Sequence, residues 1–583
     1  INFLACQLVA LLFAIPFRSL LSVEKVGTKT RHYVETVLGV LLTIFCFGYQ
    51  IWHLLVQSLV SYAVMAYGGR RFSHALVFAF SMIYLSVCHI YRQVYDYGGY
   101  TLDITGPLMI QTQKLTSLAF ALHDGRYKDQ SRLSADQKQH VVSKLPSMLQ
   151  YLSFMFYFHG IMVGPLTFYN DYIAFIDGTN YIKPGGNAAA SGSRKHPAEH
   201  LNRVVIKKLL VASACCTGMM ILPGLFFPPE KLNTPEYYNM TFFERMMFLL
   251  GVMTLAKHKY YFAWILGDAL NNAAGLGFSG YDAQGNPQFD LTDNVDVYGV
   301  EFSTSLKVNI DSWNKKTLVW LRRVVYDRAP FYNTLAVFAC SAFWHGFYPA
   351  YYITFGSGAF MTIVTRQVRR KIRPYFQKSP SFSFFYDVLT FTFCRFANAY
   401  LAMPFLVLEF QACYYMYKSL YFYLHILTLI GFITLMFVPT PKQARRQSPP
   451  GGTLAQSSTE RPASTTHERM TENKARGNGN GVSTDGSTVV QRLAHKAQDN
   501  ETNGNMVGGS TVETGGQSRK EEGGLDNAGQ NKSVNNSGST LWQGEKEQSM
   551  LIGEVEGGGG ETQAGAGPAS QPKIQFDLHT KSE

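Results

Sequence analysis

Residues 334–349 read TLAVFACSAFWHGFYP, an apolar run that ends in a histidine, a glycine and a proline. Such a run is typical of a membrane helix, and residues like Gly346 and Pro349 commonly follow the end of a helix. On a helix, Ser341 lies one turn before His345 on the same face. The pattern therefore predicts that His345 lies at the inner end of a membrane helix.

A histidine at this position has two interpretations. It can accept a proton near neutral pH and so act as a general base. A single buried histidine is more often a structural residue that is hydrogen-bonded to the backbone. The WHG-x-x-P context and an upstream segment, residues 313–323 (WNKKTLVWLRR), favour a chemical role.

Similar apolar runs recur through the first 440 residues. A membrane helix needs roughly 20 mostly apolar residues, and the second and seventh of the runs are long enough to contain a bend. We expect an all-α, polytopic membrane protein with roughly nine to eleven membrane-embedded helices, some of them re-entrant. The runs are residues 2–20, 36–66, 73–93, 206–228, 242–268, 334–355, 382–410 and 418–438, with a broken one at 147–165.

Several of these runs contain polar residues that would be costly in hydrocarbon. Such residues normally face protein or a wet cavity, which a simple lipid-facing bundle does not require. They therefore predict an internal tunnel or site. The residues are His53, His89, His159, Lys257, His258, Asp268 and His345.

The charge of the chain is concentrated between the apolar runs. Only 16% of the 583 residues are charged, with a net charge of +12. The basic residues fit cytosolic loops and contact with anionic lipid or CoA phosphates, and no nucleic-acid-binding motif accompanies them. The cluster at 366–373 (RQVRRKIR) is either a topology signal or such a phosphate contact.

The chain changes character near residue 440. Residues 1–440 form the predicted membrane domain, and the polar residues 441–583 form a predicted disordered cytosolic tail. The opening run continues into further spans, so we do not interpret it as a cleaved signal peptide. None of the eight cysteines forms a C-x-x-C pair, so no metal site or disulfide framework is expected.

Four regions of the chain carry a shared pattern. The regions are 103–125 (with DITGP, QKLTSLA and HDG), 164–172 (GPLTFYNDY), 259–282 (with KYYFAW, NNAAGLGF and GYD), and the segments that hold Asn314 and His345. Together they resemble the membrane-bound O-acyltransferase family, in its lysophospholipid acyltransferase branch. The resemblance is closest to the subgroup that acts on lysophosphatidylethanolamine and lysophosphatidylserine, and it spans nearly all of residues 1–440.

The resemblance implies a catalytic pair, an asparagine and a membrane-helix histidine, and His345 matches the histidine. Asn309 and Asn314 both precede it, but only Asn314 begins the N-x-x-T-x-x-W pattern with Thr317 and Trp320. The implied reaction moves an acyl chain from acyl-CoA, a co-substrate, to the free hydroxyl of a 1-acyl lysophospholipid. His345 would be the general base and Asn314 would position or stabilise the reacting groups, with no metal or other cofactor. The resemblance also implies an endoplasmic reticulum membrane location.

Further residues are candidates for binding substrate. The aromatic ones either pack in the core and the membrane interface or line an acyl-chain tunnel. His123 either stabilises a loop or contacts a headgroup. An acyltransferase for a protein or a sterol and, less favoured, a polytopic transporter remain alternative functions. The candidates are Trp313, Thr317, Trp320, Ser341, Trp344, Tyr260, Tyr261, Trp264 and His123.

Overall fold

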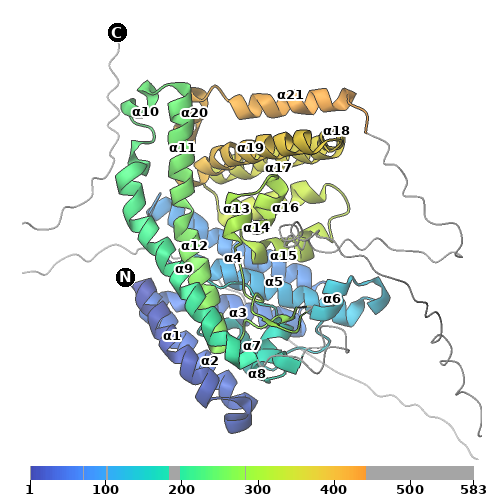
Figure 1. Ribbon diagram of the computed structural model, residues 1–583. Coiled ribbons are helices and arrows are strands. Elements are labelled where there is room, and N and C mark those ends of the chain that lie inside the picture. Colours follow the sequence, from blue (N-terminus) through green and yellow to red (C-terminus); the bar gives the residue numbers. More distant parts are fainter. Residues whose placement is uncertain (1, 70, 100–102, 183–196, 283, 441–583) are drawn as a thin grey trace, which may run out of the picture. The chain divides into compact units, whose positions relative to one another are not determined.

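A computed structural model describes residues 2–440 except 70, 100–102, 183–196 and 283. The predicted tail, and most of the polar loop between two of the apolar runs, lie outside these residues. The described chain is almost entirely helical, as predicted (Figure 1). Its strands are the two short segments β1 (Gly280–Tyr281) and β2 (Pro287–Gln288), which pair antiparallel.

The first four helices follow the first three apolar runs, whereas α5 corresponds to none of the predicted runs. The long run at 36–66 is divided between two helices, which a 3₁₀ turn, η1 (Gly48–Gln50), separates. Within α2 the backbone also departs from helical geometry at Gly27, whose φ is 72°. The helices are α1 (Asn2–Leu20), α2 (Val23–Phe47), α3 (Ile51–Tyr67), α4 (Ser73–Tyr95) and α5 (Thr105–Tyr127).

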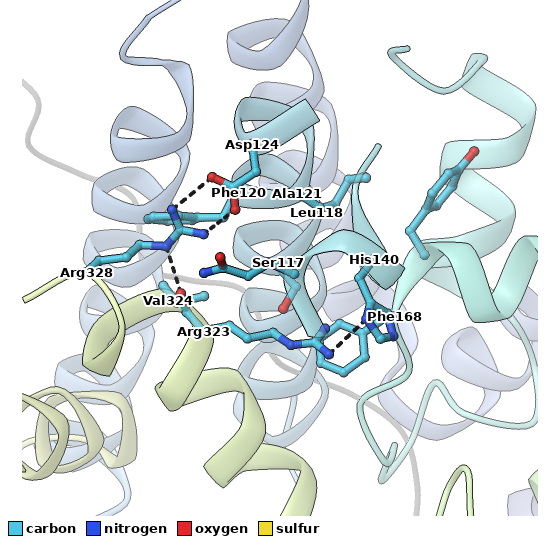
Figure 2. A pocket seen from close by; sticks show the side chains of 12 residues that line it. Ser117, Leu118, Phe120, Ala121, Asp124, His140, Phe168, Arg323, Val324 and Arg328 are labelled. Carbon is cyan, nitrogen blue, oxygen red and sulfur yellow. Dashed lines mark hydrogen bonds and ion pairs between the residues drawn. The ribbon is translucent and has the colours of Figure 1, made fainter. Parts of the chain in front are cut away.

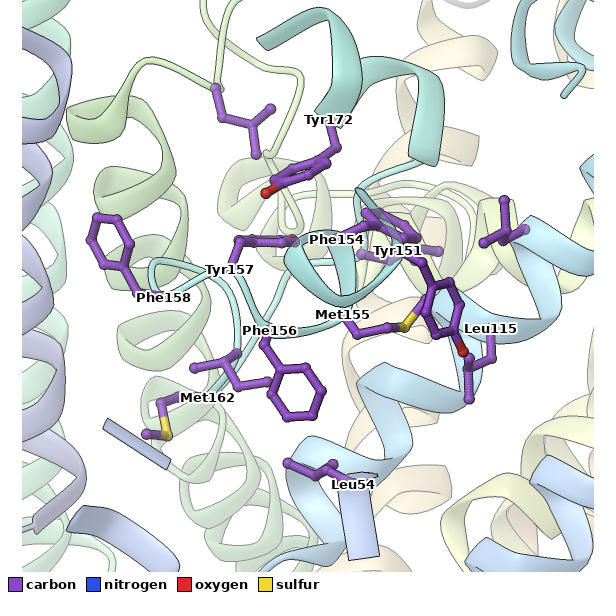
Figure 3. Close-up of a cluster of buried hydrophobic side chains, with 14 of the residues drawn as sticks. Leu54, Leu115, Tyr151, Phe154, Met155, Phe156, Tyr157, Phe158, Met162 and Tyr172 are labelled. Atoms are coloured by element: carbon purple, nitrogen blue, oxygen red, sulfur yellow. The ribbon is translucent and has the colours of Figure 1, made fainter. Parts of the chain in front are cut away.

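Helix α5 forms part of the core although its sequence is rich in polar residues. Leu115 is buried against residues from α3, from α7 (Met148–Phe156) and from α8 (Tyr169–Ile176), which meet in one apolar cluster (Figure 3). The ammonium of Lys114 donates to the carbonyls of Phe154 and Met155, at 3.2 and 3.3 Å. It thereby satisfies carbonyl groups that the end of α7 leaves without helical partners. Between α5 and α7 lie η2 (Gln130–Arg132) and α6 (Ala135–His140), and η3 (Asn180–Ile182) follows α8.

The middle of the chain forms a pair of long helical stretches. Helix α9 (Pro197–Phe226) runs beside α12 (His258–Ala274), and α12 also packs on α1 (Figure 1). The predicted run at 242–268 is divided at Lys257, so that α11 (Phe242–Ala256) and α12 are separate helices. The connection from α9 to α11 contains η5 (Pro229–Lys231) and α10 (Pro235–Asn239).

The last part of the described chain begins with short helices and continues with long ones. Helix α17 packs against α16, α19 and α21. The predicted run at 334–355 ends one helix at His345 and begins the next at Pro349, and the run at 382–410 lies mostly within a single helix. The elements are α13 (Val297–Glu301), α14 (Leu306–Ser312), α15 (Lys315–Leu321), the π-helix η6 (Arg322–Tyr326), α16 (Asn333–His345), α17 (Pro349–Lys371), α18 (Arg373–Phe376), α19 (Pro380–Val407), α20 (Phe410–Ser419) and α21 (Tyr423–Phe437).

Four helical stretches in the described chain are long and apolar enough to cross a membrane, and the α20–α21 pair, bent by 73°, makes a fifth if it is counted as one span. The nine to eleven embedded helices predicted include re-entrant and shorter ones, which this count of long helices leaves out. Two of the predicted spans are each divided into shorter helices, at Lys257 and at Gly346. Others carry charges within them, such as Asp387 and Arg395 in α19.

The polar residues within the apolar runs face either protein partners or, like His345, a cavity, as predicted. His159 lies between Glu35 and Asn271, with ring nitrogens 3.1 and 2.9 Å from their side-chain oxygens. The Asp268 carboxylate pairs with Lys208 at 2.6 Å and accepts a hydrogen bond from Thr292. These contacts link helices that are far apart in sequence and remove the cost of burying each group alone.

Candidate functional site

A cavity of about 660 Å³ lies among α11, α12, α14, α15, η6, α16, α17 and α19. Its walls are mostly apolar. His345 and Asn314, the two residues that the sequence singled out, both line it. The cavity is therefore the candidate active site.

His345 is the last residue of α16. Its imidazole stacks on Phe355 of α17 with the ring centroids 5.2 Å apart, and it meets the edge of Phe405 of α19 at 5.0 Å. Its ring has no hydrogen-bond partner within the described residues, so its nitrogens remain available to a molecule in the cavity. The aromatic rings hold the imidazole in place without occupying those nitrogens.

The backbone around His345 is fixed from α4. Gly346 has a φ of 119°, which favours glycine, and a Cβ atom there would lie 3.3 Å from the ring of His89. The ring of His89 donates to the carbonyl of Trp344 across 3.1 Å, and Gln93, one turn further on α4, donates to the carbonyl of Phe347 across 3.4 Å. The two hydrogen bonds bracket His345, and the one to Trp344 satisfies a carbonyl in the last turn of α16.

Asn314 lies at the start of α15 in the left-handed region, with φ 49° and ψ 53°. Asparagine tolerates this conformation better than most residues. The turn is held by Asn294, whose main-chain carbonyl accepts from the Lys315 amide at 2.8 Å and whose side chain accepts from the Lys316 amide at 3.0 Å. The Asn314 side chain has no hydrogen-bond partner among the described residues, so its amide is free to meet a ligand.

Asn309, the other candidate asparagine, also borders the cavity, but both of its polar side-chain atoms are engaged. Its Nδ2 donates to the carbonyl of Val300 and its Oδ1 accepts from Asn398, each at 2.7 Å. Asn309 therefore joins α13, α14 and α19. This arrangement favours Asn314 as the residue that contacts substrate.

The other candidates divide into two groups. Five line the cavity: Tyr260, Trp264, Trp313, Thr317 and Ser341. Four are absent from its lining: His123, Tyr261, Trp320 and Trp344.

The residues outside the cavity wall connect helices. Trp320 donates to Thr116, and Trp344 donates to the carbonyl of Met109, at 2.8 and 3.1 Å. The Tyr261 hydroxyl donates to Glu301 at 2.6 Å. Because Thr116 and Met109 lie on α5, these hydrogen bonds connect that helix to both α15 and α16.

His123 lies near a second, much smaller cavity of about 30 Å³, which Asp124, His140, Arg323 and Arg328 border (Figure 2). Arg328 pairs with Asp124 at 2.6 Å, and Arg323 pairs with Asp136. Burial raises the pKa of the Asp124 carboxyl, but Arg328 and Lys128 outweigh this effect and hold the pKa below its ordinary value. These ion pairs connect η6 to α6 through Arg323, and the residues just after η6 to α5 through Arg328.

The sequence did not single out several residues of the cavity and its rim. Glu301 accepts from Tyr261 and pairs with Lys257 and with Arg395, which joins α12, α13 and α19. Lys259 lines the cavity directly, and Phe355 and Phe405 hold the His345 ring. The KYYFAW stretch, which contains Lys259, could have indicated that this lysine belongs to the site. The two phenylalanines lie in apolar runs, where no sequence feature distinguishes them from their neighbours.

Comparison with known proteins gives a consistent result. Residues 90–403 match the model of the membrane-bound O-acyltransferase family. The chain is 40% identical over 452 residues to membrane-bound glycerophospholipid O-acyltransferase 2 of Rattus norvegicus, which covers 77% of this chain and 86% of that protein. It is 40% identical over 451 residues to lysophospholipid acyltransferase 6 of Drosophila melanogaster, covering 76% and 62%. With lysophospholipid acyltransferase of Schizosaccharomyces pombe the identity is 32% over 390 residues, covering 65% and 75%.

Proposed function

Because the chain belongs to the membrane-bound O-acyltransferase family, we propose that it is a lysophospholipid acyltransferase with acyl-CoA as the acyl donor. Relatives named as glycerophospholipid and lysophospholipid acyltransferases support this activity. The observation that carries the assignment of residues is that His345 and Asn314, from different segments, border one cavity with unengaged side chains. We extend the proposal to a multi-pass location in the endoplasmic reticulum membrane, supported by the family and by the apolar helices.

In this reaction His345 takes the proton from the free hydroxyl of the lysophospholipid. The hydroxyl oxygen attacks the thioester carbonyl carbon, forming an ester bond. The carbon–sulfur bond breaks, and the CoA thiolate takes the proton from the imidazolium of His345 and leaves as the thiol. A thioester is already activated, so proton transfer and positioning suffice, and no covalent acyl-enzyme is needed.

The Asn314 amide donates to the carbonyl oxygen as negative charge develops on it, or orients the hydroxyl. A single donor of this kind contributes about 3–4 kcal/mol in other acyl-transfer enzymes. The mostly apolar cavity wall suits an acyl chain.

The test is a transfer assay with membranes that contain the wild-type protein, labelled acyl-CoA and a panel of lysophospholipids. We expect CoA release together with labelled diacyl phospholipid, and a fall of about 10²–10⁴-fold for His345→Ala. If the acyl chain is transferred to none of the lysophospholipids in the panel, the proposed activity is overturned. Full activity of His345→Ala would overturn the role of His345 and leave the activity itself in place.

A further inference from the structure

The charged residues that line the large cavity are mostly basic. Lys257, Lys259, Lys307, Arg322 and Arg366 line it, against one acidic residue, Asp311. A cation that is partly removed from water without a partner is unfavourable, and an anionic ligand relieves the cost. The partners of each basic group therefore show where such a ligand fits.

Two of the three lysines already have carboxylate partners. Lys257 pairs with Glu301 at 2.6 Å, and Lys307 pairs with Asp311. Lys259 has neither an ion pair nor a hydrogen bond within the described part of the chain. Its ammonium lies 5.1 Å from the centroid of the Tyr260 ring. Lys259 is thus the lysine of the cavity wall whose charge is left for a ligand.

Lys259 and Asn314 line the same cavity, and aromatic contacts connect the segments that hold them. The rings of Tyr260 and Trp264, which follow Lys259 on α12, contact the Trp313 ring with centroid distances of 5.6 and 4.8 Å. Trp313 immediately precedes Asn314 in the chain. An anion bound at Lys259 would therefore lie close to the reacting groups.

The two arginines are engaged elsewhere. Arg322 has an ion-pair partner in Asp327, at 3.8 Å. Arg366 donates to Thr334 at 3.0 Å, near the start of α16, whereas His345 ends the same helix. At a rise of 1.5 Å per residue, Thr334 is about 16 Å from His345 along the helix axis. Arg366 therefore marks a part of the cavity that is remote from the chemistry.

The two substrates carry phosphate at different distances from the reacting atoms. In a lysophospholipid the phosphate is attached to the carbon next to the one that carries the hydroxyl. In acyl-CoA the phosphates lie at the far end of the pantetheine arm, away from the thioester. We propose that Lys259 binds the phosphate of the lysophospholipid acceptor. This inference rests on the proposed acyl transfer and assigns the acceptor subsite to the α12 wall.

The test compares Lys259→Gln, which removes the charge, with Lys259→Arg, which keeps it. The control is Lys231→Gln, a lysine outside the cavity lining that pairs with Glu236 on the surface. Initial rates are measured in membranes while lysophospholipid and acyl-CoA are varied in turn. We expect Lys259→Gln to raise the KM for lysophospholipid about tenfold or more, since a charge-assisted hydrogen bond is lost. The KM for acyl-CoA should remain within about twofold, and Lys259→Arg should restore most of the loss.

A second measurement uses a 1-acylglycerol, which has the hydroxyl but no phosphate. The rate with 1-acylglycerol should be the same for wild type and Lys259→Gln, because this acceptor has no phosphate for the lysine to bind. Equal loss with both acceptors overturns the inference. So does an increase in the KM for acyl-CoA alone, which would place a CoA phosphate at Lys259, and so does an unchanged KM for both substrates.

The outcome can be separated from protein folding and from the proposed activity. Thermal unfolding of each purified variant shows whether it is folded, and if Lys259→Gln is not, Lys259→Met and Lys259→Arg form the comparison. Suppose that the wild type is active, His345→Ala is inactive and the Lys259 variants have normal kinetics. This result rejects only the phosphate subsite and leaves the proposed acyl transfer in place. A wild type that is inactive with every lysophospholipid rejects the acyl transfer itself.

Discussion

The Nε2 atom of His89 on α4 lies 3.1 Å from the carbonyl oxygen of Trp344, the residue that precedes His345. The same ring lies against Gly346, the residue on the other side of His345. A histidine outside the cavity lining thus fixes the backbone on both sides of the proposed base. Catalysis by a positioned base depends steeply on such placement.

His89→Ala should lower kcat by about 10- to 100-fold, because a small displacement of His345 is costly, and should leave both KM values nearly unchanged. His89→Gln, which keeps a donor, should recover part of the activity. His53→Ala is the control: His53 is hydrogen-bonded to Tyr84 at 3.0 Å, between α3 and α4. Steady-state kinetics check this prediction, and an equal loss in His53→Ala would mean that disturbance of α4 alone explains the effect.

Variants of Asn314 can separate backbone strain from chemistry. Glycine adopts the left-handed conformation of this residue freely, whereas alanine is strained there. Asn314→Gly should therefore unfold at nearly the wild-type temperature, yet lose about 10²–10³-fold in kcat because the amide donor is gone. Asn314→Ala should lose both activity and stability. Wild-type kcat in Asn314→Gly would argue against a catalytic amide.

Trp320 tests whether an aromatic residue of the N-x-x-T-x-x-W pattern contacts substrate. It is fully buried, and its indole donates to Thr116. Trp320→Phe should lower the free energy of unfolding by about 1 kcal/mol through the lost hydrogen bond, with KM values unchanged. Chemical denaturation and steady-state kinetics measure the two effects. A raised KM at unchanged stability would favour substrate contact instead.

The Asp124–Arg328 pair predicts a pH dependence of stability. The pKa of Asp124 is lower in the folded protein than in the unfolded chain, so its stabilising effect is complete above the unfolded value of about 3.9. This contribution is lost as pH falls through the lower, folded pKa. Asp124→Asn should cost about 3 kcal/mol at neutral pH and flatten the acid side of the profile.

Thermal unfolding between neutral and acidic pH measures this effect. Glu236→Gln is the control, because Glu236 pairs with Lys231 on the surface, where such a pair contributes little. If Asp124→Asn loses stability with falling pH as steeply as the wild type does, the prediction is contradicted.

The sequence was informative where local chemistry decides the structure. Gly346 follows the end of α16 as expected, although Pro349, expected as a further terminator, begins α17. The N-x-x-T-x-x-W pattern favoured Asn314 over Asn309, and that choice stays a prediction. It was less informative where packing decides. The structural roles of Trp320, Trp344 and Tyr261 depend on partners that lie 204, 235 and 40 positions away. The direction of a side chain is set by these partners, which no local pattern reports.

The π-helix η6 has a consequence for inherited variation. A π turn holds one residue more than an α turn, and η6 lies between α15 and Arg328, while its own Arg323 pairs with Asp136. Loss of a single codon within residues 322–326 would restore ordinary helical winding and rotate the downstream chain by about 100°. Arg328 would then turn away from Asp124. This stretch should therefore resist in-frame deletions, so that its length is constrained in addition to the identity of Arg323.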